Sequence, residues 1–190
     1  MIIADKPKGT PLAHLLVEEL KGKNTMPFVF ELSQITSTQK GVVITPEITY
    51  SDNYWPDCLL TSLAWFLMSP KLKNIICSNL SEYDNIDWIK CSVHYKEDTK
   101  DYFLLRFLDQ IELSELLDIS RSRFIPNNGY PNVRIFDLEK ISKYSVFSPG
   151  WNSWDRTIPN YICVSTDVRK QIIKSGINGV IFKKVSTNAM

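Results

Sequence analysis

The stretch Tyr161–Val185, which reads YICVSTDVRKQIIKSGINGVIFKKV, is the most informative part of this 190-residue sequence. Residues 161–164 form a short apolar run of strand-forming side chains. Ser165 and the two residues after it can each cap the N-terminus of a helix by accepting hydrogen bonds from its first amides. The pattern therefore predicts a strand followed by a helix that begins near Thr166.

The predicted helix has one apolar side and ends at a glycine. Val168, Ile172 and Ile173 fall on one side, whereas the basic and polar residues fall mostly on the other. Gly176 stands where a left-handed C-cap is expected, and Gly179 lets the chain turn again before a second apolar strand. Because this unit lacks a reactive side chain, we expect it to serve as scaffold.

Elements outside this unit follow from the same periodicities. In the first half we expect a helix over Pro11–Leu20 that carries His14, strands over Phe28–Leu32 and Gly41–Tyr50, and a helix from Asp57 to Pro70. In the second half we expect strands over Trp88–Tyr95 and Tyr102–Leu108, a turn over Lys96–Asp101, a short helical or irregular element over Ser114–Ile119, a hairpin loop over Pro126–Pro131, a strand over Val133–Phe136 and a turn from Asp137 to Ile141.

Three of these elements have defined faces or positions. The inner face of the helix from Asp57 is predicted to consist of Leu59, Leu63, Phe66 and Leu67. In the strand over 88–95, one face consists of Ile89, Cys91, Val93 and Tyr95, and the opposite, wet face consists of Trp88, Lys90, Ser92 and His94. Pro46 predicts an edge position or a bulge in the strand over 41–50.

The elements together predict an α+β fold with a mixed or mainly antiparallel sheet and a few packed helices. We expect a single domain over residues 1–190, with residues 1–55 as a candidate N-terminal subdomain. A composition of 44% hydrophobic and 23% charged residues is ordinary for a globular protein that buries a core.

Two further features concern location and redox state. The first residues lack a basic region followed by an apolar core, so we expect no secretory signal and a cytoplasmic location. The longest apolar stretch, Cys58–Met68, is shorter than the roughly 20 residues that span a bilayer, and we interpret it as a core helix with no membrane contact. Four widely spaced cysteines predict small buried side chains: Cys58, Cys77, Cys91 and Cys163.

Charge is distributed unevenly along the chain although its formal net value is +1. Residues 81–118 contain ten acidic and four basic residues, a local net charge of −6, whereas bases outnumber acids after residue 118. The two halves either compensate each other or present opposite patches to partners. The overall balance argues against direct contact with nucleic acid.

A search for catalytic and metal-binding motifs finds none. The two histidines, His14 and His94, show no metal-ligand spacing, and the nucleophile, phosphate-loop and dinucleotide motifs are absent from the sequence. We therefore expect no enzyme, no metal and no cofactor. His94, on the same predicted strand as Trp88, is a candidate acid or base. The loop with Trp151, Trp154, Asp155 and Arg156 is a sharper signal, because tryptophan and arginine anchor protein interfaces.

The segment Ser165–Val185 resembles the ending of immunity proteins from bacterial polymorphic toxin systems. Tyr102–Ile111 and the leucine- and aspartate-containing Glu112–Ser120 are similar to segments of the same group, so that the resemblance covers roughly the second half of the chain. It implies a non-enzymatic, cytoplasmic α+β protein that binds and neutralises a cognate protein toxin.

This resemblance leads to a main hypothesis of stoichiometric inhibition, by a monomer or small homo-oligomer. The residues expected to contact the toxin are Glu82, Asp84, Asp87, Trp88, His94, Glu97, Asp98, Trp151, Trp154, Asp155 and Arg156. The alternative is a small-ligand-binding protein or enzyme with a pocket near the Trp151–Arg156 loop, which would use His94, Arg156 or a carboxylate. A structural or regulatory partner domain is a third interpretation.

Overall fold

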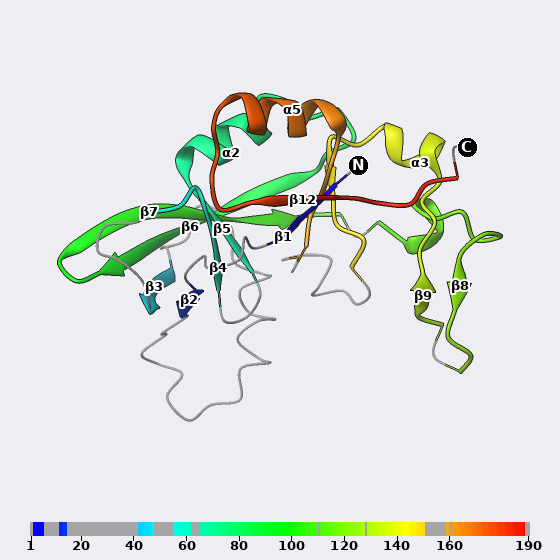
Figure 1. Cartoon of the computed structure of the whole chain (residues 1–190), viewed down its shortest axis with the longest axis horizontal. Coiled ribbons are helices and arrows are strands. Elements are labelled where there is room, and N and C mark those ends of the chain that lie inside the picture. The colour runs from blue at the N-terminus through cyan, green and yellow to red at the C-terminus, as the bar shows by residue number, and fades with distance from the viewer. Residues whose placement is uncertain are drawn as a thin grey trace.

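The computed structural model describes residues 2–5, 12–14, 42–47, 55–61, 65–109, 111–127, 129–150, 159 and 161–188. Over these residues the chain has the predicted α+β fold, with three α-helices and three sheets. Helices α2 (Pro70–Cys77) and α5 (Thr166–Lys174) lie side by side on one side of the strands (Figure 1).

The C-terminal strand, helix and strand unit is confirmed. It consists of β11 (Cys163–Val164), α5 and β12 (Ile181–Lys184). Ser165 is the N-cap of α5, and its hydroxyl accepts a hydrogen bond from the Val168 amide. The two strands are not neighbours, because the N-terminal β1 (Ile2–Asp5) lies between them and pairs antiparallel with both.

The sheet that contains this unit has four strands in the order β10-β11-β1-β12, with β10 over Val146–Phe147. Val168 and Ile172 of α5 are buried in the main core, as the apolar spacing predicts. Ile173 is 54% exposed, so its assignment to the buried side is wrong. In an α-helix, one residue corresponds to about 100°, which carries Ile173 away from the stripe.

Six further strands form a closed sheet in the order β2-β3-β6-β7-β5-β4. Their bounds are Leu12–His14 for β2, Val42–Glu47 for β3, Cys58–Thr61 for β4, Phe66–Met68 for β5, Ile86–Tyr95 for β6 and Asp98–Phe107 for β7. The main core lies where helices α2 and α5 cover the outside of this closed sheet, and it includes Leu72, Ile76, Trp88, Leu105 and Ile172.

Strands β6 and β7 form a long hairpin that pairs from Ile86↔Phe107 to Tyr95↔Asp98. The turn is shorter than predicted, because only residues 96–97 connect the strands and Lys96 adopts a positive φ of 52°. Side chains of Ile89, Cys91 and Val93 are buried, as their alternation predicts. The opposite face is not wet throughout, since α2 covers its first part and leaves Trp88 only 8% exposed.

The helix predicted from Asp57 to Pro70 is wrong. Cys58–Thr61 and Phe66–Met68 instead form antiparallel strands, with Leu59 opposite Leu67. An apolar run of this length suits a buried helix or buried strands equally, and the pairing with β7 favours strands here. Pro70 begins α2 after the N-cap Ser69 and does not end a helix.

The N-terminal predictions have mixed outcomes. Residues 12–14, including His14, form β2 and not the expected helix, because they pair with β3 and β4. The strand expected over 41–50 is present as β3, and its Pro46 pairs with β2 beyond the part that pairs with β6. The strand expected over 28–32 lies outside the described residues.

A second core supports the C-terminal half beside the β8–β9 hairpin. It includes Leu116, Leu117, Phe136, Tyr144, Phe147 and Cys163. The hairpin and its neighbours are η2 (a 3-10 helix, Leu113–Glu115), β8 (Arg123–Phe124), β9 (Pro131–Val133) and α3 (Leu138–Ser142), with Asp137 as the N-cap of α3. Of the strand predicted over 133–136, only Val133 lies in an observed strand, at the end of β9.

Candidate functional site

The acidic stretch predicted to meet a partner is divided between the two ends of β6. Glu82 and Asp84 precede the strand, whereas Glu97 and Asp98 lie at the tip of the β6–β7 hairpin. Ten residues of strand at about 3.3 Å each place these two acidic groups about 30 Å apart. The predicted contact residues therefore do not form one continuous acidic surface.

Asp84 holds the base of the hairpin to the neighbouring sheet. Its carboxylate accepts hydrogen bonds from the amides of Ser81 at 2.7 Å, Ser145 at 3.1 Å and Val146 at 3.3 Å. These bonds join the turn before β6 to the start of β10. Glu82, two residues earlier, is exposed.

Asp87 and Trp88 face the protein itself. Asp87 Oδ2 pairs at 2.5 Å with Nη2 of Arg106, which stands directly opposite on β7 and is almost fully buried. Trp88 belongs to the main core, and the ammonium of Lys73 lies 5.8 Å from its ring centroid. A contact of either residue with a partner stays a prediction.

The tip of the hairpin carries three more of the predicted contact residues. Glu97 and Asp98 are exposed, and His94 is half-buried with its Nδ1 2.8 Å from the hydroxyl oxygen of Thr99. The exposed Lys96 and Lys100 lie beside these two acids, so the tip of the hairpin carries charges of both signs. The remaining predicted residues, Trp151, Trp154, Asp155 and Arg156, lie outside the described residues.

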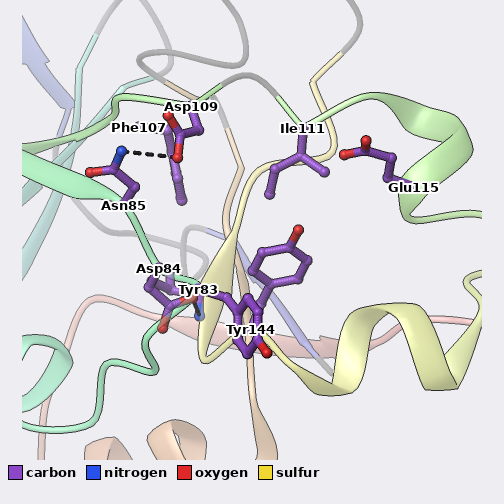
Figure 2. A pocket seen from close by; sticks show the side chains of 9 residues that line it. Tyr83, Asp84, Asn85, Phe107, Asp109, Ile111, Glu115 and Tyr144 are labelled. Atoms are coloured by element: carbon purple, nitrogen blue, oxygen red, sulfur yellow. Dashed lines mark hydrogen bonds between the residues drawn. The ribbon is translucent and has the colours of Figure 1, made fainter.

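A pocket of about 180 Å³ lies at the opposite end of the hairpin from this tip (Figure 2). Its lining comes from the turn before β6, the segment after β7, η2 and the connection from α3 to β10: Tyr83, Asp84, Asn85, Phe107, Asp109, Ile111, Glu115, Tyr144 and Val146. Phe107, Tyr144 and Val146 are buried, whereas Tyr83, Asp109 and Glu115 are exposed. The pocket thus has an apolar floor and a polar rim.

The charged groups that line this pocket are all acidic. Asp109 accepts a hydrogen bond from the Asn85 side chain at 2.9 Å. No hydrogen bond or ion pair joins the Glu115 carboxylate to another described residue, and Figure 2 shows it directed toward Ile111. The rings of Tyr83 and Tyr144 meet edge to face, with centroids 6.5 Å apart.

Sequence reasoning found the acidic character of this region but not the pocket. Tyr83, Asp109, Ile111, Glu115 and Tyr144 are brought together by the return of β7 and by the docking of β10 beside β11. The one signal in the sequence was the excess of acids over residues 81–118. Which of them would share a pocket depends on strand pairing that the local pattern does not specify.

A second hollow lies between α2 and α5, where a groove of about 420 Å³ is lined by Asn74, Ile75, Ser78, Asn79 and Gln171. Its lining is made of amide, hydroxyl and aliphatic side chains. Asn79 is already engaged, since its amide nitrogen donates to the Ile75 carbonyl at 2.7 Å. The groove therefore offers hydrogen bonds but no charged or titratable group.

The cysteines are free thiols in contrasting environments. Cys58, Cys91 and Cys163 are buried, as predicted, whereas Cys77 at the end of α2 is exposed. Burial raises the pKa of Cys58 to about 12, with a smaller contribution from the charge of Asp57. Burial likewise raises the pKa of Cys163 to about 12. The thiolate is the reactive form, so these two thiols are protected because they are inaccessible to reagents and remain protonated.

We expect iodoacetamide at neutral pH to modify Cys77 alone in the native protein and all four cysteines in denaturant, as counted by intact mass. A Cys77→Ser variant is the control and should remain unmodified when native. Rapid native labelling of that variant would show that one of the buried thiols is accessible.

Two searches of the described residues concern metals and membranes. No group of three or more His, Cys, Asp or Glu side chains in the described ranges could hold a metal ion. None of the helices described is long and apolar enough to cross a membrane.

The structure thus combines an α+β fold with acidic side chains at both ends of a projecting hairpin and with a small acidic pocket. The family described as Immunity protein family (Imm11) matches residues 39–187, which is most of the chain. The chain therefore belongs to the Imm11 immunity protein family. No curated protein matches it. Immunity protein families are generally non-enzymatic and imply a toxin partner.

Proposed function

We propose that this chain neutralises a cognate bacterial toxin by forming a stoichiometric complex that occludes the toxin's active site or substrate path. The observation that carries the proposal is the match to the Imm11 immunity family over residues 39–187. In this mechanism no residue of the chain performs chemistry. Affinity and geometry alone prevent the toxin from reaching its substrate.

The charge distribution supports this proposal. Exposed acids lie at both ends of the β6–β7 hairpin, at Glu82 and at Glu97 and Asp98. Negative groups on the surface accelerate the encounter with a basic partner, such as a nuclease, through long-range attraction. Because the overall charge is only +1, the attraction is local to this part of the surface. We propose that these acids and the Trp151–Arg156 segment form the toxin-binding surface.

The direct test is to mix the purified chain with the toxin domain encoded beside it and to measure complex formation and growth rescue on co-expression. We expect a 1:1 complex and restored growth. Absence of both binding and rescue with the adjacent toxin would contradict the proposed function.

Replacing two tryptophans tests the proposed surface. Trp151→Ala with Trp154→Ala should weaken toxin binding at least about 30-fold, because buried aromatic anchors each contribute about 2 kcal/mol or more at protein interfaces. Binding is measured by calorimetry, and the folded state is checked by thermal unfolding. Tyr130→Ala is the control, because Tyr130 is a 46% exposed aromatic side chain on the β8–β9 loop that is not among the predicted contact residues. Unchanged affinity in a folded double variant would remove this segment from the interface.

A further inference from the structure

We infer that the pocket at the base of the β6–β7 hairpin receives one basic side chain of the toxin, with arginine as the best fit. This inference rests on the proposed function and identifies a particular recognition site within it. Of the residues that line this pocket, only Asp84 was among the toxin contacts expected from the sequence. The arguments are the size of the pocket, its charge and its aromatic lining.

The size of the pocket favours a side chain over a small molecule. Pockets for drug-sized ligands usually enclose about 300–1,000 Å³, whereas this one encloses about 180 Å³. A single long side chain from a protein partner fits such a space. The apolar floor formed by Phe107, Tyr144 and Val146 suits the methylene groups of arginine or lysine, which pack well on apolar surface.

The charge of the pocket selects a cation. Asp84, Asp109 and Glu115 contribute carboxylates to its lining, and the described lining residues include no base. Asp84 is used by backbone amides, so Asp109 and Glu115 are the groups that remain directed to an incoming charge. Asp109 receives one hydrogen bond from Asn85, which holds its carboxylate in place and leaves further acceptor positions.

The aromatic lining adds a second attraction for a cation. The ammonium of the protein's own Lys143 already lies 5.0 Å from the ring centroid of Tyr144 and 5.7 Å from that of Tyr83. Lys143 therefore already places one cation beside these rings, and the exposed part of the Tyr83 ring is what remains for the toxin's side chain. Tyr83 is 53% exposed at the rim, where a planar guanidinium can stack on its ring while bonding a carboxylate in a bidentate manner. This combination favours arginine over lysine.

The experiment measures binding of the adjacent-encoded toxin domain to wild-type protein and to Asp109→Asn and Glu115→Gln. Both substitutions keep the shape of the side chain and remove its charge. We expect each to raise the dissociation constant at least about 30-fold, mainly through faster dissociation, as when one partner of a desolvated charge pair is removed. The matched control is Asp167→Asn, which removes one exposed acid on α5 that is not part of the pocket lining.

The outcomes separate this inference from the proposed function. If wild type binds and both pocket variants bind within about twofold of it, the pocket is not a recognition site and the proposed function stands. If Asp167→Asn weakens binding as much as the pocket variants, the effect is general electrostatics and the pocket inference is wrong. If wild type does not bind, both proposals fall. Thermal unfolding of Asp109→Asn and Glu115→Gln checks that the binding measurements are made on folded proteins.

Discussion

Gly179→Ala should lower the free energy of unfolding by about 2–5 kcal/mol. This is the largest effect that we expect from a substitution that removes no functional group. Gly179 has a φ of +84°, which costs an L-residue about 1–2 kcal/mol. A Cβ there would lie 2.3 Å from the Cys58 carbonyl oxygen, a backbone atom that cannot turn aside. The measurement is urea unfolding monitored by tryptophan fluorescence.

Gly176→Ala is the matched control for this prediction. Gly176 follows α5 with a φ of +64°, but a Cβ at that position would meet nothing within 4 Å. It should cost about 1 kcal/mol, from backbone conformation alone. The difference between the two variants therefore measures the close approach of Gly179 to β4. Equal effects would show that the approach contributes nothing.

This contact explains why the C-terminal unit matters beyond its own sheet. Asn178 Oδ1 accepts a hydrogen bond from the Asp57 amide at 2.8 Å, and the Asn178 amide donates to Asp57 Oδ2 at 3.2 Å. Asp57 also accepts a hydrogen bond from the hydroxyl of Ser69, the N-cap of α2. The turn before β12 thus joins the four-stranded sheet to the closed sheet. A larger residue at 179 would separate them.

The local pattern predicted this turn but not its partner. Capping residues, glycine positions and apolar spacing are short-range signals, and they identified α5, β12, β6 and the N-cap of α3 correctly. The prediction for residues 58–68 failed because a largely apolar run, interrupted only at residues 61–62, has no clear periodicity to separate helix from strand. Insertion of β1 between β11 and β12 is a long-range pairing. It has no signature in the neighbouring sequence.

The candidate site shows the same division between short-range and long-range information. Acidic composition was visible in the sequence, but the side-chain partners were not. Asp84 binds backbone amides and Asp87 binds a buried arginine, whereas Asp109 and Glu115, which were not selected, line a pocket. A carboxylate's role depends on which groups face it after folding. Charge counting cannot separate structural acids from those free to meet a partner.

Asp87→Ala should destabilise the fold by about 3 kcal/mol, because it removes a carboxylate that pairs with the buried Arg106 guanidinium. The Arg106 side chain is 6% exposed and that of Asp87 is 22% exposed, so the pair is largely removed from water. Asp87 Oδ1 also accepts the Trp88 amide at 2.6 Å. Urea unfolding measures the change, and toxin affinity is measured on the folded fraction.

Two further variants distinguish a buried ion pair from a toxin contact. Asp101→Ala breaks the Lys90–Asp101 pair on the same hairpin, whose side chains are 54% and 46% exposed, and should cost within about 1 kcal/mol. Combining Asp87→Ala with Arg106→Met should restore part of the lost stability, because the double variant also removes the buried charge that the Asp87 carboxylate balances. If Asp87→Ala instead keeps full stability and loses toxin affinity, Asp87 contacts the toxin. Loss of growth rescue by Asp87→Ala must be compared with the measured stability of this variant, because an unfolded inhibitor also fails to protect the cell.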